Sequence, residues 1–151
     1  MSPVDWRFSK RPPRETLLSN DTQGVEPLRN EADIVTCRQA VRKLVVQLKF
    51  SLVDQTKMIT AASELSRNTV VYGGGGVMEW ELVTDMLKQG LRLRFKDQGP
   101  GIPDLGLALK DGWTSGKGMG LGLSGSKRLV HEFEIESTVG VGTCVSVTRW
   151  K

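Results

Sequence analysis

The spacing of apolar residues changes from a helical to a strand period at a run of four glycines, residues 73–76. Before this run, apolar residues recur every three or four positions. After it, they alternate with charged residues in residues 78–82 and again in residues 91–96. A period of about 3.6 indicates amphipathic helices, and a period of two indicates strands that bury one face only. The chain is therefore expected to pack helices against one face of a sheet.

Two long helices are predicted before the glycines. The first begins at Asp33, a capping type of residue, and its apolar stripe continues to Leu48. The second runs from about Val53 to about Tyr72 and is preceded by the Ser-x-x-Asp spacing of a capping box at residues 51–54. A short third helix is predicted at residues 105–110 and a fourth at residues 124–131.

Strands are predicted at residues 78–82 and 91–96, as a closing hairpin at residues 133–138 and 143–150, and as a shorter strand at residues 25–28. This order of elements predicts an α+β fold. The architecture expected is a two-layer α/β sandwich, with helices on one face of a mixed, mainly antiparallel sheet.

Residues 1–24 differ from the remainder because they contain three prolines and scattered charge but no apolar period. They are predicted to form a flexible N-terminal arm, followed by one domain at residues 25–151. A domain of this length can bury a sufficient core without a disulfide or a metal.

Composition excludes several classes of function. Apolar runs stay far below the ~18 residues of a membrane span, and no secretory signal is present, so a cytoplasmic location without membrane contact is expected. Cys37 and Cys144 belong to no CxxC pair and are interpreted as core residues, and His131 is the only histidine, which argues against zinc and thiol-redox sites. The net charge of +4 is spread among acidic residues, so no nucleic-acid partner is expected.

The glycines gather in two boxes, residues 97–101 and 116–122, where a backbone could approach a ligand closely. Three phosphate motifs do not fit them. The P-loop fails because the segment before Gly118 is one residue too short and no Ser or Thr follows the lysine. The Rossmann fingerprint lacks its βαβ unit, and the glycine loop of protein kinases lacks HRD and DFG partners.

A fourth pattern fits. Glu64 and Asn68 are four residues apart on the second helix and share one face, where a carboxylate is a candidate base and an amide oxygen a candidate magnesium ligand. The order Glu-x-x-x-Asn, Asp-x-Gly-x-Gly, a Gly-x-Gly-x-Gly helix start and a late Gly-Thr resembles the GHKL ATP-binding superfamily of gyrase, heat-shock chaperone, histidine kinase and MutL domains. The resemblance implies a Bergerat fold that binds ATP and Mg²⁺.

The resemblance also assigns roles. Glu64 is the catalytic base, and Asn68 is the metal ligand. Asp97 accepts a hydrogen bond from the adenine amino group, and Thr143 reaches the adenine through water. Residues 104–116 form a lid, and the helix start that follows holds the phosphates. The ATP-binding residues expected are Asn68, Tyr72, Asp97, Gly99, Gly101, Thr114, Gly116, Lys117, Gly118, Met119, Gly120, Leu121, Gly122, Leu123 and Thr143.

Within the superfamily, the runs DQGPGIPD, DGWTSG and VGTCVSVTRW resemble the RsbT-type serine/threonine kinases of the bacterial stressosome. That resemblance implies phosphorylation of a STAS-domain antagonist (RsbS- or RsbR-like) and, after release, activation of a PP2C-type phosphatase (RsbU-like). Two alternatives stay open: an anti-sigma factor of the RsbW or SpoIIAB type, and a nucleotide-binding adaptor without turnover, which an intact Glu64 disfavours. Homodimer formation is also left open.

Overall fold

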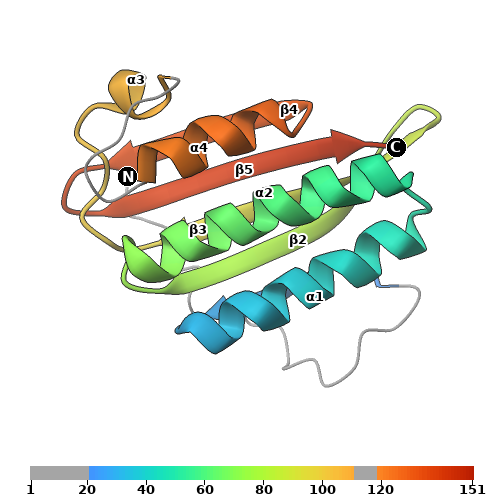
Figure 1. Cartoon of the computed structure of the whole chain (residues 1–151), viewed down its shortest axis with the longest axis horizontal. Coiled ribbons are helices and arrows are strands. Elements are labelled where there is room, and N and C mark those ends of the chain that lie inside the picture. The colour runs from blue at the N-terminus through green and yellow to red at the C-terminus, as the bar shows by residue number, and fades with distance from the viewer. Residues whose placement is uncertain (1–20, 111–118) are drawn as a thin grey trace.

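Five strands form one sheet in the computed structural model, which describes residues 21–110 and 119–151 (Figure 1). They are β1 (Gln23–Leu28), β2 (Gly76–Asp85), β3 (Lys88–Asp97), β4 (Glu132–Thr138) and β5 (Gly142–Trp150). Their order is β1-β2-β3-β5-β4, and all four pairings are antiparallel. The α+β class is confirmed, with a sheet that in these residues is antiparallel throughout and not mixed.

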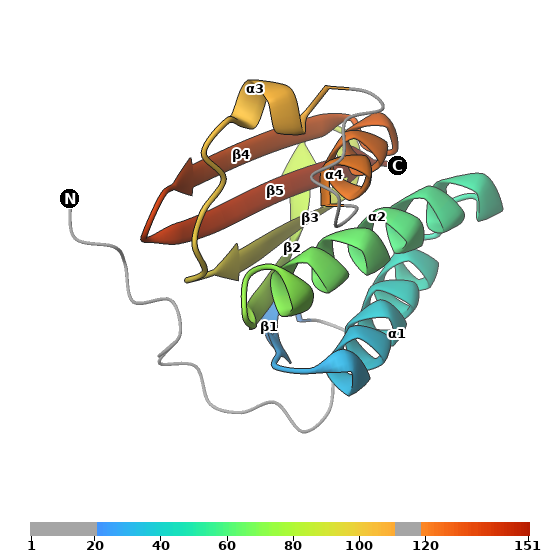
Figure 2. The same ribbon diagram turned by 60° about the vertical axis from the view of Figure 1, so that its left-hand side comes forward.

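Helices α1 (Glu31–Gln47), α2 (Leu52–Val71) and α4 (Met119–Arg128) cover one face of this sheet (Figures 1 and 2). The short helix α3 (Leu105–Ala108) contacts α4. The molecule therefore has the two expected layers. Residues 1–20 of the predicted arm lie outside the described residues. Strand β1 begins at Gln23, two residues before the predicted start of the domain at Val25.

The start of α1 corrects the sequence prediction. Asn30, and not Asp33, is the N-cap, and its side chain accepts a hydrogen bond from the backbone N–H of Asp33. The Asp33 carboxylate in turn accepts the backbone N–H of Arg29 at 2.8 Å, and an Arg29 ion pair holds the pKa of Asp33 below its usual range. Asp33 is thus the third helical residue, and its carboxylate reaches back to the residue before the cap, one position earlier than in a capping box.

The fourth helix also differs from expectation. It begins at Met119, five residues before the predicted start at Ser124, and ends at Arg128, so that His131 lies in the connection to β4. Helical structure continues through Gly122 and Gly125 because packing against α2 overrides the weak helix propensity of glycine. By contrast, the Ser51 cap of α2 is confirmed, with Ser51 Oγ accepting the N–H of Asp54.

The core lies between the helices and the sheet. Leu82 was predicted to point inward and is partly buried against the core. Five other strand residues predicted to point inward are fully buried there: Met78, Trp80, Leu91, Leu93 and Phe95. Cys37 is also buried, with its Sγ 3.3 Å from Met78 Sδ, whereas Cys144 is half-buried on the opposite face of the sheet and is not part of the core. None of the helices in the described ranges has the length and apolar character needed to cross a membrane.

Candidate functional site

A cleft opens where the C-terminal half of α2 meets the end of β3, the loop that follows β3 and the start of β5. The fold brings together residues from four separate parts of the sequence there. The predicted site residues that line it are Asn68, Tyr72, Asp97, Gly101, Leu123 and Thr143. Gly99 does not line the cleft, but its role follows from its packing.

Asp97 is the last residue of β3 and lies at one end of the cleft. Its Oδ1 accepts two backbone hydrogen bonds, from Gly99 N at 2.9 Å and from Thr143 N at 3.3 Å. Burial nevertheless raises the pKa of Asp97, because desolvation outweighs these two bonds. Since Oδ1 is already engaged, Oδ2 is the oxygen that can accept a hydrogen bond from a ligand.

Two glycines allow the loop after β3 to lie against the end of α2. A methyl group on Gly73 would lie 2.6 Å from Asp97 Oδ2, and one on Gly99 would lie 2.7 Å from the backbone of Gly73. Both distances are shorter than van der Waals contact. Gly73 is therefore a site residue that the sequence analysis missed. The available signal was its position directly after Tyr72, on the helix of Glu64 and Asn68.

Gly101 is required for a different reason. Its φ is +79°, a left-handed conformation in which side chains are disfavoured, and a methyl group there would lie 2.5 Å from the carbonyl oxygen of Thr138. The loop 98–102 is thus held between the end of α2 and the β4–β5 hairpin. Gly140 N also donates to Pro100 O at 2.9 Å.

At the other end of the cleft, the start of α4 lies against Glu64 and Asn68. A methyl group on Gly122 would lie 3.1 Å from Asn68 Nδ2 and 3.4 Å from Glu64 Oε2. Glu64 is exposed, while Asn68 is half-buried and its Nδ2 is buried without a hydrogen-bond partner among the described residues. A helix N-terminus favours anions. A carboxylate, an amide and an anion-binding helix start therefore converge here.

Part of the predicted site lies outside the described residues. This applies to residues 111–116 of the predicted lid, which include Thr114 and Gly116, and to Lys117 and Gly118. The surroundings of Met119, Gly120 and Leu121 also lie outside what the structure describes.

Ser137 is a second residue that the sequence analysis missed. Its Oγ lies 2.7 Å from Thr143 Oγ1 and accepts a hydrogen bond from Ile102 N at 2.8 Å. Its sequence signal is weak: a small polar residue at an inward position of a strand whose outward positions are glutamates.

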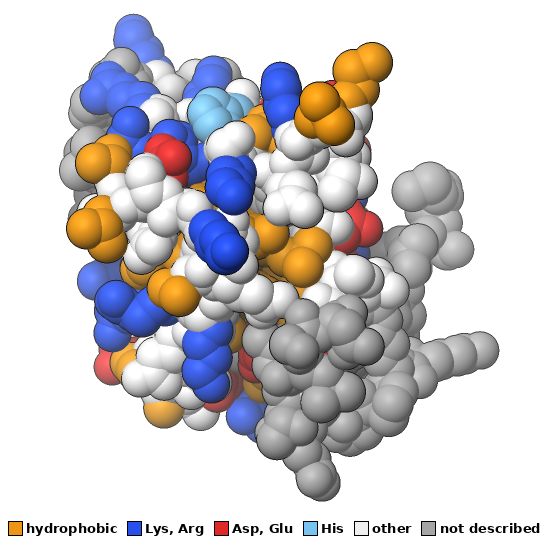
Figure 3. All heavy atoms as spheres, turned by 90° about the vertical axis from the view of Figure 1, so that its right-hand side faces the viewer, with side chains coloured by type: hydrophobic (Ala, Val, Ile, Leu, Met, Phe, Trp, Pro, Cys, Tyr) orange, Lys and Arg blue, Asp and Glu red, His pale blue; other side chains and the backbone are white. Residues whose placement is uncertain are grey.

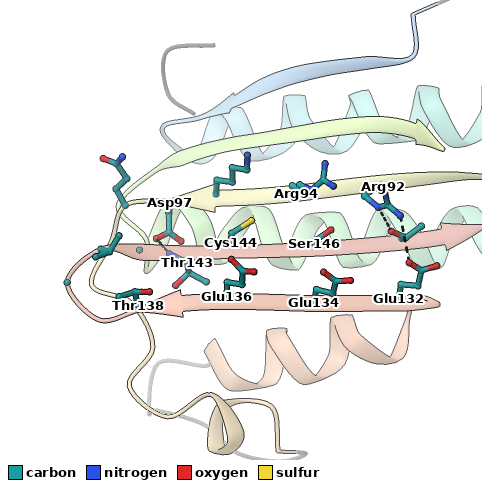
Figure 4. Close-up of a pocket in the computed structure, with 16 residues that line it drawn as sticks. Arg92, Arg94, Asp97, Glu132, Glu134, Glu136, Thr138, Thr143, Cys144 and Ser146 are labelled. Carbon is teal, nitrogen blue, oxygen red and sulfur yellow. Dashed lines mark hydrogen bonds and ion pairs between the residues drawn. The ribbon is translucent and has the colours of Figure 1, made fainter. Parts of the chain in front are cut away.

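A larger hollow of about 830 Å³ lies on the face of the sheet that the helices leave open (Figure 4). Acidic, basic and small side chains occupy separate strands there. Glutamates lie on β2, basic residues on β3, small residues on β5, and three further glutamates on β4: Glu132, Glu134 and Glu136. Ion pairs join side chains on neighbouring strands, such as Lys96 on β3 with Glu79 on β2 at 2.8 Å. This pattern is typical of a solvated sheet face.

Figure 3 shows the end of the molecule away from the cleft, where exposed apolar side chains are interspersed with Lys and Arg. Met86 and Leu87 at the tip of the β2–β3 hairpin are almost fully exposed. No predicted site residue among those described lies in that hairpin. The predicted chemistry is thus confined to the cleft end.

Comparison with known proteins agrees with this geometry. Residues 53–151 match the family described as "Histidine kinase-, DNA gyrase B-, and HSP90-like ATPase". The serine/threonine-protein kinase RsbT of Bacillus subtilis (strain 168) is 44% identical over 120 residues, which cover 80% of this chain and 90% of that protein. The matched family region contains every residue that lines the cleft.

Proposed function

The chain belongs to the histidine kinase-, DNA gyrase B- and HSP90-like ATPases and, within them, to the RsbT-type serine/threonine-protein kinases, and we propose that this cleft transfers the γ-phosphate of ATP to a partner protein. One observation carries the proposal. The start of α4 lies against Glu64 and Asn68 at one end of the cleft, while Asp97 and Thr143 lie at the other. This arrangement suits phosphates at the first end and a purine at the second.

Asp97 Oδ2 would accept a hydrogen bond from the adenine amino group, and the backbone N–H groups at the start of α4 would hold the phosphates. Asn68 Oδ1 is the magnesium ligand in this proposal. An amide oxygen suits Mg²⁺, which takes few protein ligands and relies on phosphate oxygens. When bound, the ion would neutralise charge on the phosphates.

Glu64 would act as the general base. Its carboxylate is exposed and therefore accessible to a hydroxyl of a second protein. As a Ser or Thr oxygen bonds to the γ-phosphorus and the bond to the β-phosphate oxygen breaks, Glu64 takes the hydroxyl proton and ADP leaves. Asp97 and Thr143 have no part in proton transfer, because they lie at the end of the cleft proposed to bind adenine.

The partners proposed are a STAS-domain antagonist as substrate and a PP2C-type phosphatase that the released kinase activates, in a cytoplasmic stressosome pathway. The likeness to RsbT of B. subtilis over 80% of the chain supports this assignment. The anti-sigma interpretation becomes an outcome of the test below.

The test is Glu64→Gln, which keeps the shape and one acceptor oxygen but removes the basicity. We expect unchanged ATP affinity and phosphotransfer from radiolabelled ATP to a STAS-domain protein reduced ~10²- to 10⁴-fold. Glu134→Gln, at an exposed glutamate on the open face of the sheet, is the matched control and should retain the wild-type rate. A wild-type rate for Glu64→Gln would show that another group is the base. A wild type that transfers no phosphate but retains a sigma factor would favour the anti-sigma interpretation.

A further inference from the structure

Ser137 connects three segments at the adenine end of the cleft. Its hydroxyl accepts the N–H of Ile102 at 2.8 Å, lies 2.7 Å from Thr143 Oγ1, and lies 3.4 Å from the carbonyl oxygen of Gly142. Ser137 is half-buried, whereas its neighbours on β4, Glu136 and Thr138, are exposed. The hydroxyl therefore faces the inner side of the sheet, next to the loop that follows Asp97.

Either hydroxyl could donate across the 2.7 Å between Ser137 Oγ and Thr143 Oγ1, and the other partners of Ser137 bear on the direction. A serine hydroxyl has one proton, and Ile102 N–H occupies one of its lone pairs. Two acceptors are in reach of that proton. Thr143 Oγ1 at 2.7 Å has the distance of a good O–H···O bond, whereas Gly142 O at 3.4 Å does not. When Ser137 donates to Thr143, the proton of Thr143 can turn toward the cleft that Thr143 lines.

We propose that Ser137 is a positioning residue that makes Thr143 a hydrogen-bond donor and thereby selects adenine. Adenine presents an amino donor beside the N1 acceptor. Asp97 Oδ2 can accept from the amino group, and Thr143 can donate to N1 directly or through one water. Guanine presents the reverse pattern, an O6 acceptor beside an N1–H donor. Its O6 would face the acceptor Asp97 Oδ2 and its N1–H would face the donor Thr143, so neither hydrogen bond could form. This inference rests on the ATP site proposed above.

The test compares Ser137→Ala with the wild type by calorimetry, using ATP and 1-deaza-ATP, in which a C–H group replaces N1. We expect Ser137→Ala to weaken ATP binding about three- to tenfold, the effect of one hydrogen bond, and to leave 1-deaza-ATP binding unchanged. The ratio of ATP to GTP affinity should fall in parallel. Ser137→Thr keeps the hydroxyl and should restore both values.

Two further variants keep the test interpretable. Ser137→Cys is close in volume and donates weakly, so it should behave as Ser137→Ala does even if the alanine variant folds poorly. Ser146→Ala removes a hydroxyl from β5 on the open face of the sheet and should bind all three nucleotides as the wild type does.

Equal losses for ATP and 1-deaza-ATP would overturn the inference, because they would show a general structural role. An unchanged ATP affinity in Ser137→Ala would also overturn it. A wild type that binds no ATP would instead overturn the proposed function, and this inference with it.

Discussion

Replacing Asp97 with Asn is expected to weaken ATP binding and to strengthen GTP binding. The reason lies in how the two carboxylate oxygens are used. Oδ1 accepts Gly99 N and Thr143 N, and the amide oxygen of Asn can keep both bonds. The amide nitrogen then takes the place of Oδ2. A donor would therefore face the amino group of adenine, while the same donor would suit the O6 oxygen of guanine.

The magnitude follows from the charge that is lost. A hydrogen bond to a charged group contributes about 1.5 to 3 kcal/mol, so ATP affinity should fall about 10- to 150-fold. GTP should gain a neutral hydrogen bond of about 1 kcal/mol, close to fivefold. The stability of the folded protein should stay equal or rise in Asp97→Asn, although its ATP affinity falls. Burial raises the pKa of Asp97, which shows that the ionised carboxylate is disfavoured in the folded protein, and a neutral side chain avoids that cost.

Calorimetry with ATP and GTP and thermal unfolding without nucleotide measure the three quantities separately. The reasoning predicts weaker ATP binding, tighter GTP binding and a melting temperature equal to or above that of the wild type. Equal ATP affinity in the two proteins would show that Asp97 does not contact the adenine. A parallel loss of ATP and GTP affinity with a lower melting temperature would show that Asp97 organises the loop and does not read the base.

Three further outcomes are expected. Asn68→Ala should abolish the magnesium-dependent part of the ATP-induced rise in melting temperature, and a full rise would exclude Asn68 as the ligand. Gly122→Ala should impair phosphotransfer, because the methyl group would lie 3.1 Å from Asn68 Nδ2, whereas Gly125→Ala has open space and should be neutral or stabilising, as unfolding and kinase assays can show. An Arg149 hydrogen bond lowers the pKa of Asp54, so this contribution to stability is present above the unfolded pKa of about 3.9 and is lost as pH falls through the lower folded pKa. Arg149→Met should therefore flatten the fall of the melting temperature below pH 4, and an unchanged slope would contradict the assignment.

Local patterns in the sequence predicted the elements whose signals are local. The Ser51 cap requires only a hydroxyl three residues before an N–H, and the alternation in residues 91–96 directly predicts one buried face. Asn30 and Asp33 are both capping residues, and in the structure Asn30 caps the helix while the Asp33 carboxylate accepts a hydrogen bond from Arg29 N, a contact that the pattern did not contain. Local signals of similar strength can therefore shift a helix start by one turn.

The site residues, too, were predicted where a local motif contains them and missed where none does. Asp97 belongs to a glycine box with a recognisable spacing, and the structure places it in the cleft. Gly73 and Ser137 had no such motif. Gly73 matters because it contacts a loop more than 20 residues later, and Ser137 because strand pairing places it opposite Thr143. The first contact depends on how the loop after β3 packs against the end of α2, and the second on the register of the β4–β5 hairpin, and neither is specified by a motif.

The rows of like-charged side chains along the strands, on the open face of the sheet, also affect aggregation. Strand β4 lies at one edge, and its outward glutamates recur at every second residue. If a second copy added its own β4 to this edge in antiparallel fashion, the two rows of glutamates would come together, and like charges directly opposite each other are unfavourable. At the other edge, Pro27 removes one backbone donor from β1. Both edges of the described sheet thus discourage strand addition between copies during expression and storage at high concentration.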